Sequence, residues 1–371
     1  MRIVHLANMY GPRSGGLRTT VNELSRRYAY EGHEVLVIVP DEQSKNFRNG
    51  NITFTTIKSP RIPLSGGYRI ILKTRTIIEL VKAFNPDVIE LSDRTTMLKV
   101  ASWAKSAGIP VYFFAHERVS GVIDAFASWL PRKKSLVRYW NSKTYHIVHR
   151  IIATTHMAAS EFNELGIDSH EGHKISIIPL GVDLQRFKPV DEKTNRENYF
   201  LACTRLSKEK DPDFILDIAS LMKKRNINLP IIIAGMGPLF RRMQKRIESE
   251  GLNVHLLGFI EDKIQLNQLM QNSICLLAPG PIETFGLAAL ECLASGTPVI
   301  CRDSSAISEV ISETSGCSLP RDPKAWFDQM LNFKEFDRGM LIEQARNRAM
   351  NFSWDKTAHD LIELYEMRVV A

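Results

Sequence analysis

Short apolar runs alternate with amphipathic stretches along the whole chain, and this alternation predicts repeated β–α units. Strands are predicted at Ile3–Ala7, Glu34–Val39, 50–60, Val88–Leu91, Val111–Ala115, Ile151–Thr155, Tyr199–Cys203, Pro230–Ala234, Leu256–Phe259, Ser273–Ala278 and from Val299. Helices are predicted around Val21–Ala29, at Ile70–Phe84, up to Ala107, and at Phe214–Arg225, Leu287–Ala294, Ser304–Ile311, Ala325–Phe333, Leu341–Met350 and up to about Met367. The fold class that follows is α/β, with parallel sheets covered by helices.

The length of the chain and a polar segment near its middle predict two domains. A chain of 371 residues exceeds one ordinary hydrophobic core. The segment Pro189–Glu197 is polar and is the predicted linker. We expect one domain over residues 1–185 and a second over 190–352.

Composition is that of an ordinary globular protein, with 44% hydrophobic and 24% charged residues. No apolar run reaches the roughly 18 residues of a membrane span. The opening MRIVHLANMYGP reads as a strand and a turn rather than a signal peptide, so we expect a cytoplasmic location. All five cysteines lie in the second half without a C-x-x-C pair, which favours buried, reduced thiols.

Charge is distributed unevenly between the two halves. Residues 1–185 carry 24 Lys and Arg against 16 Asp and Glu, whereas residues 186–371 carry 24 against 25. A basic half indicates a surface that meets an anionic partner, either nucleic acid or a membrane, or else only a solvated face. Within it, residues 118–150 interleave cations with aromatic residues, a pattern typical of an interfacial helix on an anionic membrane or of a packed helix with a basic face. The residues concerned are Arg118, Arg132, Lys133, Lys134, Arg138, Lys143 and Arg150, with Phe126, Trp129, Leu130, Tyr139, Trp140 and Tyr145.

The stretch Leu276–Ile300 carries the strongest candidate chemistry. It reads as a strand, a Pro/Gly turn, a helix from Leu287 and a return strand, which is where α/β proteins bind anionic ligands. Glu283 lies in the loop and Glu291 follows eight residues later in an apolar helix, where a carboxylate needs a partner. That partner is either a ligand's hydroxyl pair or a salt bridge.

Other loops that follow predicted strands add glycines and cations. Gly15 and Gly16 precede the first helix, where they indicate either a plain tight turn or a loop whose backbone approaches a phosphate closely. Arg205 and Lys210 lie five residues apart in one loop, which is either an ordinary basic loop or one that binds a diphosphate. The sequence Asp211-Pro212-Asp213 has the spacing of a metal site, but it is typical of a helix start and is interpreted as one.

Several phrases, in order along nearly the whole chain, resemble retaining glycosyltransferases of family four. The most specific is E-T-F-G-L-A-A-L-E between A-P-G-P and A-S-G-T-P-V-I, which resembles that family's E-x7-E signature. Arg205 and Lys210 resemble its R-x4-K element, although Thr204 stands where that element usually has glycine. Further similar phrases are G-H-E-V, P-D-V-I-E, I-P-L-G-V-D-x-x-x-F, G-x-G-P and F-S-W-D.

The resemblance implies the GT-B fold, two Rossmann-like domains facing across a cleft, with the closing helix of about residues 353–371 crossing back to the first domain. It implies a nucleotide-diphospho-sugar donor with no metal or other cofactor. It assigns His116, Glu283, Arg205 and Lys210 to catalysis. The donor-binding residues that it implies are Gly15, Gly16, Arg205, Lys210, Gly235, Gly237, Phe259, Glu283, Thr284, Phe285, Gly286, Leu287 and Glu291.

The wording of the motifs also resembles actinobacterial mannosyltransferases that build phosphatidylinositol mannosides. The resemblance therefore implies hexose transfer, with GDP-mannose as the preferred donor, to a lipid or glycan acceptor at the cytoplasmic membrane face. An anionic membrane surface is the expected partner, rather than nucleic acid. UDP-glucose, UDP-galactose and UDP-N-acetylglucosamine remain alternative donors. A GT-B sugar-nucleotide epimerase and a catalytically silent binding subunit remain alternatives of other classes.

Overall fold

The computed structural model describes residues 1–11, 15–62, 67–116, 133–163, 174–190 and 198–369. The chain divides into two compact units. Unit 1 is Met1–Leu180 with Trp354–Ala371, and unit 2 is Gly181–Ser353. The first unit therefore ends five residues before the predicted limit of 185, and the second begins at Gly181 rather than at 190.

Unit 1 is built on an eight-stranded sheet in the order β3-β4-β2-β1-β5-β6-β7-β8. All neighbouring strands are parallel except the β3–β4 pair, which is antiparallel at one edge. The strands are β1 (Arg2–Leu6), β2 (Glu34–Asp41), β3 (Lys45–Asn49), β4 (Ile52–Lys58), β5 (Val88–Leu91), β6 (Val111–Phe114), β7 (Arg150–Ala153) and β8 (Ile175–Ile177). The central strands are buried on both faces, as expected for a parallel sheet covered by helices.

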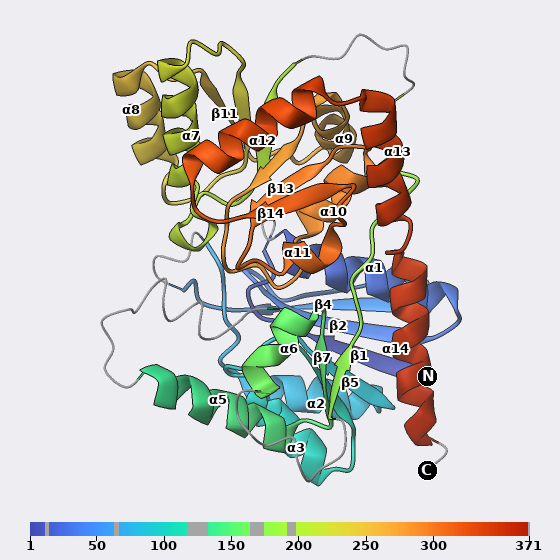
Figure 1. Cartoon of the computed structure of the whole chain (residues 1–371). Helices are drawn as coiled ribbons and strands as arrows, with labels where there is room; N and C mark the ends of the chain where they lie inside the picture. Colours follow the sequence, from blue (N-terminus) through green and yellow to red (C-terminus); the bar gives the residue numbers. More distant parts are fainter. Residues whose placement is uncertain (12–14, 63–66, 117–132, 164–173, 191–197, 370–371) are drawn as a thin grey trace. The chain divides into compact units, whose positions relative to one another are not determined.

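Helices from both ends of the chain cover this sheet (Figure 1). They are α1 (Gly16–Tyr30), α2 (Thr74–Phe84), α3 (Leu98–Ser106), α5 (Lys133–Ile147), α6 (His156–Asn163) and the last helix, α14 (Trp354–Val369). Helix α14 packs beside α1, so the C-terminal segment belongs to the same unit as the N-terminal strand.

A buried polar cluster joins α14 to the centre of the unit 1 sheet. The Glu90 carboxylate, on β5, accepts hydrogen bonds of 2.7 Å from the hydroxyls of Tyr28 on α1 and Tyr365 on α14. Its second oxygen lies 2.6 Å from Nδ1 of His5 on β1. All four side chains are buried, and a buried carboxylate is tolerated only with such partners. The pKa values of both tyrosines are raised well above the usual one, chiefly by burial and then by Glu90.

Unit 2 is built on a six-stranded parallel sheet in the order β11-β10-β9-β12-β13-β14. The strands are β9 (Phe200–Cys203), β10 (Ile231–Ala234), β11 (Val254–Gly258), β12 (Leu276–Ala278), β13 (Val299–Arg302) and β14 (Gly316–Leu319). Chain order departs from spatial order between β11 and β12, because β12 pairs with β9 instead. Ligands of open α/β sheets bind at the carboxyl ends of strands around such a switch point.

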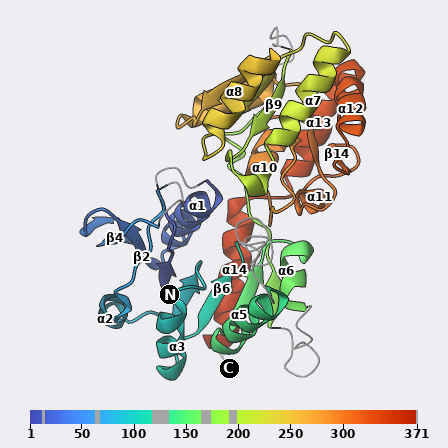
Figure 2. The same ribbon diagram turned by 90° about the vertical axis from the view of Figure 1, so that its left-hand side faces the viewer.

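The helices of unit 2 pack on both sides of its sheet (Figure 2). They are the short 3₁₀ helix η1 (Lys208–Lys210), α7 (Asp213–Lys224), α8 (Phe240–Glu250), α9 (Lys263–Asn272), α10 (Leu287–Ala294), α11 (Ile307–Val310), α12 (Pro323–Glu335) and α13 (Arg338–Ala349). Helix α7 packs against α12 through Phe214 and Trp326, whose rings meet edge to face at 5.2 Å.

The two sheets, parallel except for the β3–β4 pair, confirm the predicted α/β class, but several elements differ from prediction. Strand β12 begins at Leu276 rather than Ser273, and α2 begins at Thr74 rather than Ile70. Strand β3 was not predicted, because all five of its residues are exposed and its sequence, KNFRN, lacks an apolar face. Strands β8 and β14 and helices α8 and α9 were not predicted either. Helix α10 spans the predicted Leu287–Ala294.

Candidate active site

The candidate residues of unit 2 gather at the carboxyl ends of its parallel strands. The loop after β9 carries Arg205 and Lys210, and the loop after β12 carries Glu283 and leads into α10. The loop after β10 carries Gly235 and Gly237. Since β10, β9 and β12 are neighbours in the sheet, the three loops adjoin at one edge.

Gly235 and Gly237 are required by the close approach of two backbones. A Cβ at Gly235 would lie 1.8 Å from the carbonyl oxygen of Thr204, and one at Gly237 would lie 2.3 Å from that of Leu206. Any side chain there would push the β9 and β10 loops apart. The predicted glycine positions are thus packing positions for the loop that holds Arg205. Thr204 is accommodated because the glycines that allow the approach lie on the β10 loop.

Lys210 and Glu283 form an ion pair between the β9 and β12 loops. The Lys210 ammonium donates to a Glu283 carboxylate oxygen at 2.6 Å, and each side chain is about one quarter exposed, at 21% and 25%. Gly280 lets the β12 loop pack closely against the backbone of Lys210, since a Cβ atom at Gly280 would lie 3.2 Å from the Cα atom of Lys210. A half-buried cation held at a strand end can stabilise negative charge on a ligand without first being ordered.

Helix α10 starts beside this ion pair. Gly286 takes the left-handed conformation at its N-cap, with φ 92°, and a Cβ there would lie 2.4 Å from the side chain of Ile307. The preceding Phe285 is buried against Phe352, with ring centroids 6.0 Å apart. The amides of the first helical turn from Leu287 point out of the helix start, where backbone N–H groups and the helix dipole favour an anion.

Glu291 lies buried in the middle of α10 and has an ion-pair partner. Its carboxylate is 3.3 Å from the ammonium of Lys263, on α9. Burial raises the pKa of Glu291, and the charge of Lys263 opposes that rise. The predicted need for a partner is therefore met by a lysine in this structure. The pair leaves a carboxylate and an ammonium at the same end of the sheet as Lys210.

Arg205 follows β9, in the middle of this group of loops, and Phe259 follows β11, the outermost strand of the sheet. Arg205 is half-buried, and its carbonyl oxygen accepts a hydrogen bond from the amide of Ser207. Phe259, just after β11, is 43% exposed, as is Met236 at 38% in the neighbouring loop. Thr284 lies between Glu283 and the buried Phe285 and is half-buried. The exposed aromatic ring of Phe259 is a side chain on which another ring can pack.

The three remaining candidates belong to unit 1. His116 follows β6, and its Nε2 atom lies 3.2 Å from the hydroxyl of Ser92, which follows β5. Burial lowers the pKa of His116 to about 4, so the imidazole is neutral at neutral pH. Gly15 and Gly16 are exposed at the start of α1, with Gly15 at the N-cap. The basic and aromatic residues of 117–132 lie outside the described residues.

Sequence reasoning missed the partners of the acidic residues. Lys263 is 28 residues from Glu291 and belongs to another helix, so no local spacing signals the pair. Asp211 is bound by Arg302 and Arg321, and Asp213 by Arg242. Asp213 begins α7, as the helix-start interpretation predicts. Within the described residues, no group of three or more His, Cys, Asp or Glu side chains is placed to hold a metal ion.

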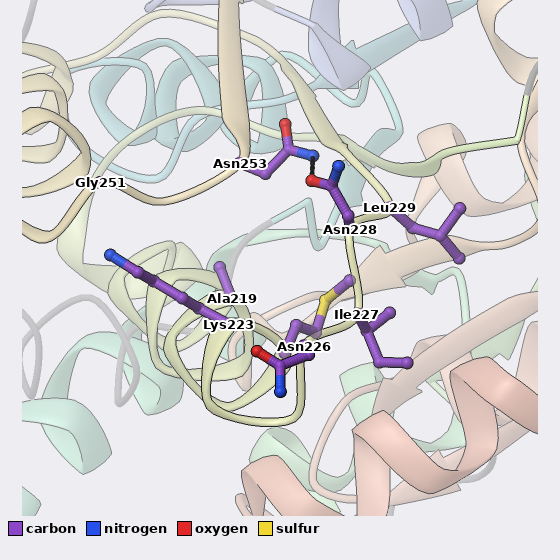
Figure 3. Close-up of a pocket in the computed structure, with 9 residues that line it drawn as sticks. Ala219, Lys223, Asn226, Ile227, Asn228, Leu229, Gly251 and Asn253 are labelled. Carbon is purple, nitrogen blue, oxygen red and sulfur yellow. Dashed lines mark hydrogen bonds between the residues drawn. The ribbon is translucent and has the colours of Figure 1, made fainter.

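A pocket of about 330 Å³ lies at the amino ends of β10 and β11, away from the loops that carry the candidate residues. Figure 3 shows the residues that line it. It is lined by the end of α7 and the loops before β10 and β11, including Lys223, Asn226, Asn228 and Asn253. The Asn253 amide donates to the Asn228 side-chain oxygen at 3.0 Å. This pocket contains none of the candidate residues.

The chain matches two family models that together cover most of it. Residues 14–186 match the model described as Glycosyltransferase Family 4, and residues 184–348 match that described as Glycosyl transferases group 1.

Among the helices that the structure describes, none is both long enough and apolar enough to cross a membrane.

Two relatives carry names that specify glycolipid synthesis. The chain is 34% identical over 377 residues to a Mycobacterium tuberculosis GDP-mannose-dependent alpha-(1-6)-phosphatidylinositol dimannoside mannosyltransferase, covering 98% of this chain and 95% of the relative. It is 22% identical to the alpha-monoglucosyldiacylglycerol synthase of Streptococcus pneumoniae, covering 84% and 74% of the two chains.

Solved structures support the fold. Sucrose-phosphate synthase from Thermosynechococcus elongatus superposes with a TM-score of 0.79 at 18% identity, covering 100% of this chain and 99% of that one. Anabaena HepE in complex with UDP and glucose gives 0.76 at 16% identity, covering 99% of each chain. These likenesses and the two parallel sheets confirm the predicted GT-B class. With the family models and a relative 34% identical over nearly its whole length, the chain belongs to the family-four glycosyltransferases.

Proposed function

We propose that this glycosyltransferase moves mannose from GDP-mannose to a phosphatidylinositol-mannoside-type lipid, with retention of anomeric configuration and without a metal. The observation that carries the proposal is the Lys210–Glu283 ion pair at 2.6 Å, beside the start of α10. A cation beside the free amides of a helix start is suited to bind a leaving diphosphate, and this supports the proposal. The name of the mycobacterial relative supports the choice of sugar and lipid.

The reaction breaks the bond between the sugar's anomeric carbon and the diphosphate oxygen, and forms a bond from that carbon to an acceptor hydroxyl oxygen. The acceptor's proton passes to the departing diphosphate, so a nucleoside diphosphate and a glycoside are the products. Lys210, Arg205 and the α10 amides from Leu287 stabilise the negative charge that develops on the diphosphate. The bond to the diphosphate breaks ahead of the formation of the new bond, and the acceptor oxygen attacks on the face of the sugar that the diphosphate leaves. Retention then needs no carboxylate nucleophile.

The remaining site residues receive binding roles in this proposal. Glu291 accepts hydrogen bonds from the ribose hydroxyls, exchanging part of its contact with Lys263 for them. Glu283 contacts the transferred sugar, and the nucleobase packs on the exposed ring of Phe259. His116 lines the sugar pocket as a neutral imidazole, with Ser92 fixing its ring. Gly15 and Gly16 approach the phosphates through backbone amides.

We further propose that the protein works at the cytoplasmic face of the membrane as a peripheral enzyme. Helix α5 contains no acidic residue, and Lys134, Arg138 and Tyr139 on it are exposed. Trp140 and Tyr145 on the same helix pack inward, so the helix is anchored in unit 1 while Lys134 and Arg138 are exposed. Cations with an exposed aromatic ring favour an anionic lipid surface.

The test is transfer of labelled mannose from GDP-mannose to purified phosphatidylinositol dimannoside in the presence of EDTA. The proposal expects a lipid product that an α-mannosidase releases and a β-mannosidase does not. A β-linked product would contradict retention, and activity that appears only when Mg²⁺ or Mn²⁺ is restored would contradict metal independence. Epimerisation of a UDP-sugar with no transfer would favour the epimerase.

A further inference from the structure

A second ion cluster lies immediately after Lys210. The Asp211 carboxylate is 3.0 Å from the guanidinium of Arg302, the last residue of β13. The same carboxylate receives two contacts from Arg321, after β14, at 2.8 and 3.3 Å. One aspartate on the β9 loop is therefore tied to the carboxyl ends of two strands that lie beyond β12 in the sheet.

The backbone at Asp211 is also unusual. Asp211 has φ 45°, in the left-handed region that residues with a Cβ rarely adopt. Such a conformation persists where its surroundings determine it strongly. Its carbonyl oxygen accepts a hydrogen bond from the amide of Phe214, the second residue of α7, so the turn connects η1 directly to that helix.

Both arginines are held in place by packing as well as by charge. The guanidinium of Arg302 lies 5.6 Å from the ring centroid of Phe214, and that of Arg321 lies 4.9 Å from it. The Arg302 side chain is 8% exposed, whereas that of Arg321 is 49% exposed and also reaches Asp217 at 3.5 Å. A carboxylate held by two oriented guanidiniums has little freedom to move.

These contacts enclose the backbone of Lys210 from two sides. Gly280 of the β12 loop lies against the Cα atom of Lys210, and Asp211 fixes the next peptide toward β13 and β14. From this backbone the ammonium of Lys210 extends to Glu283. We infer that Asp211, with Arg302 and Arg321, is a positioning residue that sets the place of the Lys210 ammonium for the leaving diphosphate. This inference rests on the proposed function of Lys210.

The decisive variant is Asp211→Gly, since glycine keeps the left-handed turn and removes the carboxylate. The matched control is Asn226→Gly, which makes a similar change at the other left-handed residue flanking α7, where φ is 57°. With GDP-mannose as donor, we expect Asp211→Gly to lower kcat about 10-fold or more while KM changes less than about 3-fold, because misplacement affects the transition state most. Asn226→Gly is expected to stay within about 2-fold of wild type in both.

A double-mutant cycle separates positioning from general damage. If Asp211 acts through Lys210, adding Asp211→Gly to Lys210→Ala lowers kcat by less than about 2-fold further. The inference would be overturned if Asp211→Gly lowered kcat in the Lys210→Ala background as much as it does in the wild type. It would also be overturned if Asp211→Gly kept the wild-type kcat while Lys210→Ala was impaired. Wild-type kcat in Lys210→Ala itself would instead contradict the proposed function. If Asp211→Gly melts early, Asp211→Asn and Arg321→Gln serve in its place, with the same expectations.

Discussion

Lys210 is the residue on which the proposed chemistry most depends. Its ammonium is half-buried, bonded to Glu283 and adjacent to the start of α10. We expect Lys210→Ala to reduce turnover by about 100-fold or more, since one preorganised charge donor in an active site contributes on that scale. Steady-state transfer measures the effect, and Lys208→Ala is the control because Lys208 is exposed in the same 3₁₀ helix. Equal losses in the two variants would remove Lys210 from the mechanism.

Glu291 makes opposite contributions to stability and to function. Burial raises the pKa of this carboxyl in the folded protein. The folded protein therefore binds the carboxyl proton more tightly than the unfolded chain does. Its contribution to stability is therefore greatest below the unfolded pKa and is lost as the pH rises through the folded pKa. We expect Glu291→Gln to raise the melting temperature by about 1–3 °C at pH 7 and to have little effect near pH 4. The same variant should weaken donor binding; a lower melting temperature at pH 7 would contradict this account.

At the scale of elements, α14 depends on a buried carboxylate. The Tyr365 hydroxyl donates to Glu90 at the centre of the sheet. We expect Tyr365→Phe to lower the free energy of unfolding of unit 1 by about 1–3 kcal/mol, because a buried acceptor loses a donor. Urea unfolding followed by tryptophan fluorescence measures this change. Tyr30→Phe, at an exposed tyrosine on α1, is the control, and equal effects in both variants would show that the Glu90 contact is unimportant.

Elements that tertiary contacts define were harder to predict than those with a strong local pattern. Helix α10 has Gly286 before it and Gly296 after it, so the sequence itself indicates where the helix begins and ends. Helix α2 begins four residues later than its apolar pattern, because the amide of Ile71 bonds to the side chain of Asn8, 63 residues away. Strand β3 exists through pairing with β4 and has no apolar face of its own.

The candidate site could be predicted only in part, for the same physical reason. Charges in loops after strands indicated Lys210 and Glu283, whereas Gly235 and Gly237 were indicated only by the resemblance to family four. The packing of both glycines against the β9 loop is a contact between loops that only the sheet order brings together. Ion pairs between distant elements, such as Lys263 with Glu291, have no sequence signal because their spacing is set by the fold.

At the scale of the whole molecule, the charge excess of the first half predicts electrostatic membrane binding. Residues 1–185 hold the excess of cations, including the exposed Lys134 and Arg138 on α5. We expect vesicles containing phosphatidylinositol or phosphatidylserine to bind the protein at low salt and to release it near 0.5 M NaCl, where screening is strong. Co-sedimentation measures this binding. Equal binding to neutral phosphatidylcholine vesicles would contradict the electrostatic account.

The identity of the donor is the central claim about the whole molecule. It is tested most directly by binding and slow hydrolysis of GDP-mannose beside UDP-glucose, UDP-galactose and UDP-N-acetylglucosamine, in EDTA and without acceptor. We predict that GDP-mannose alone binds tightly and releases mannose at a measurable rate. A preference for any of the UDP-sugars, or binding of none of the four, would contradict the mannosyltransferase assignment.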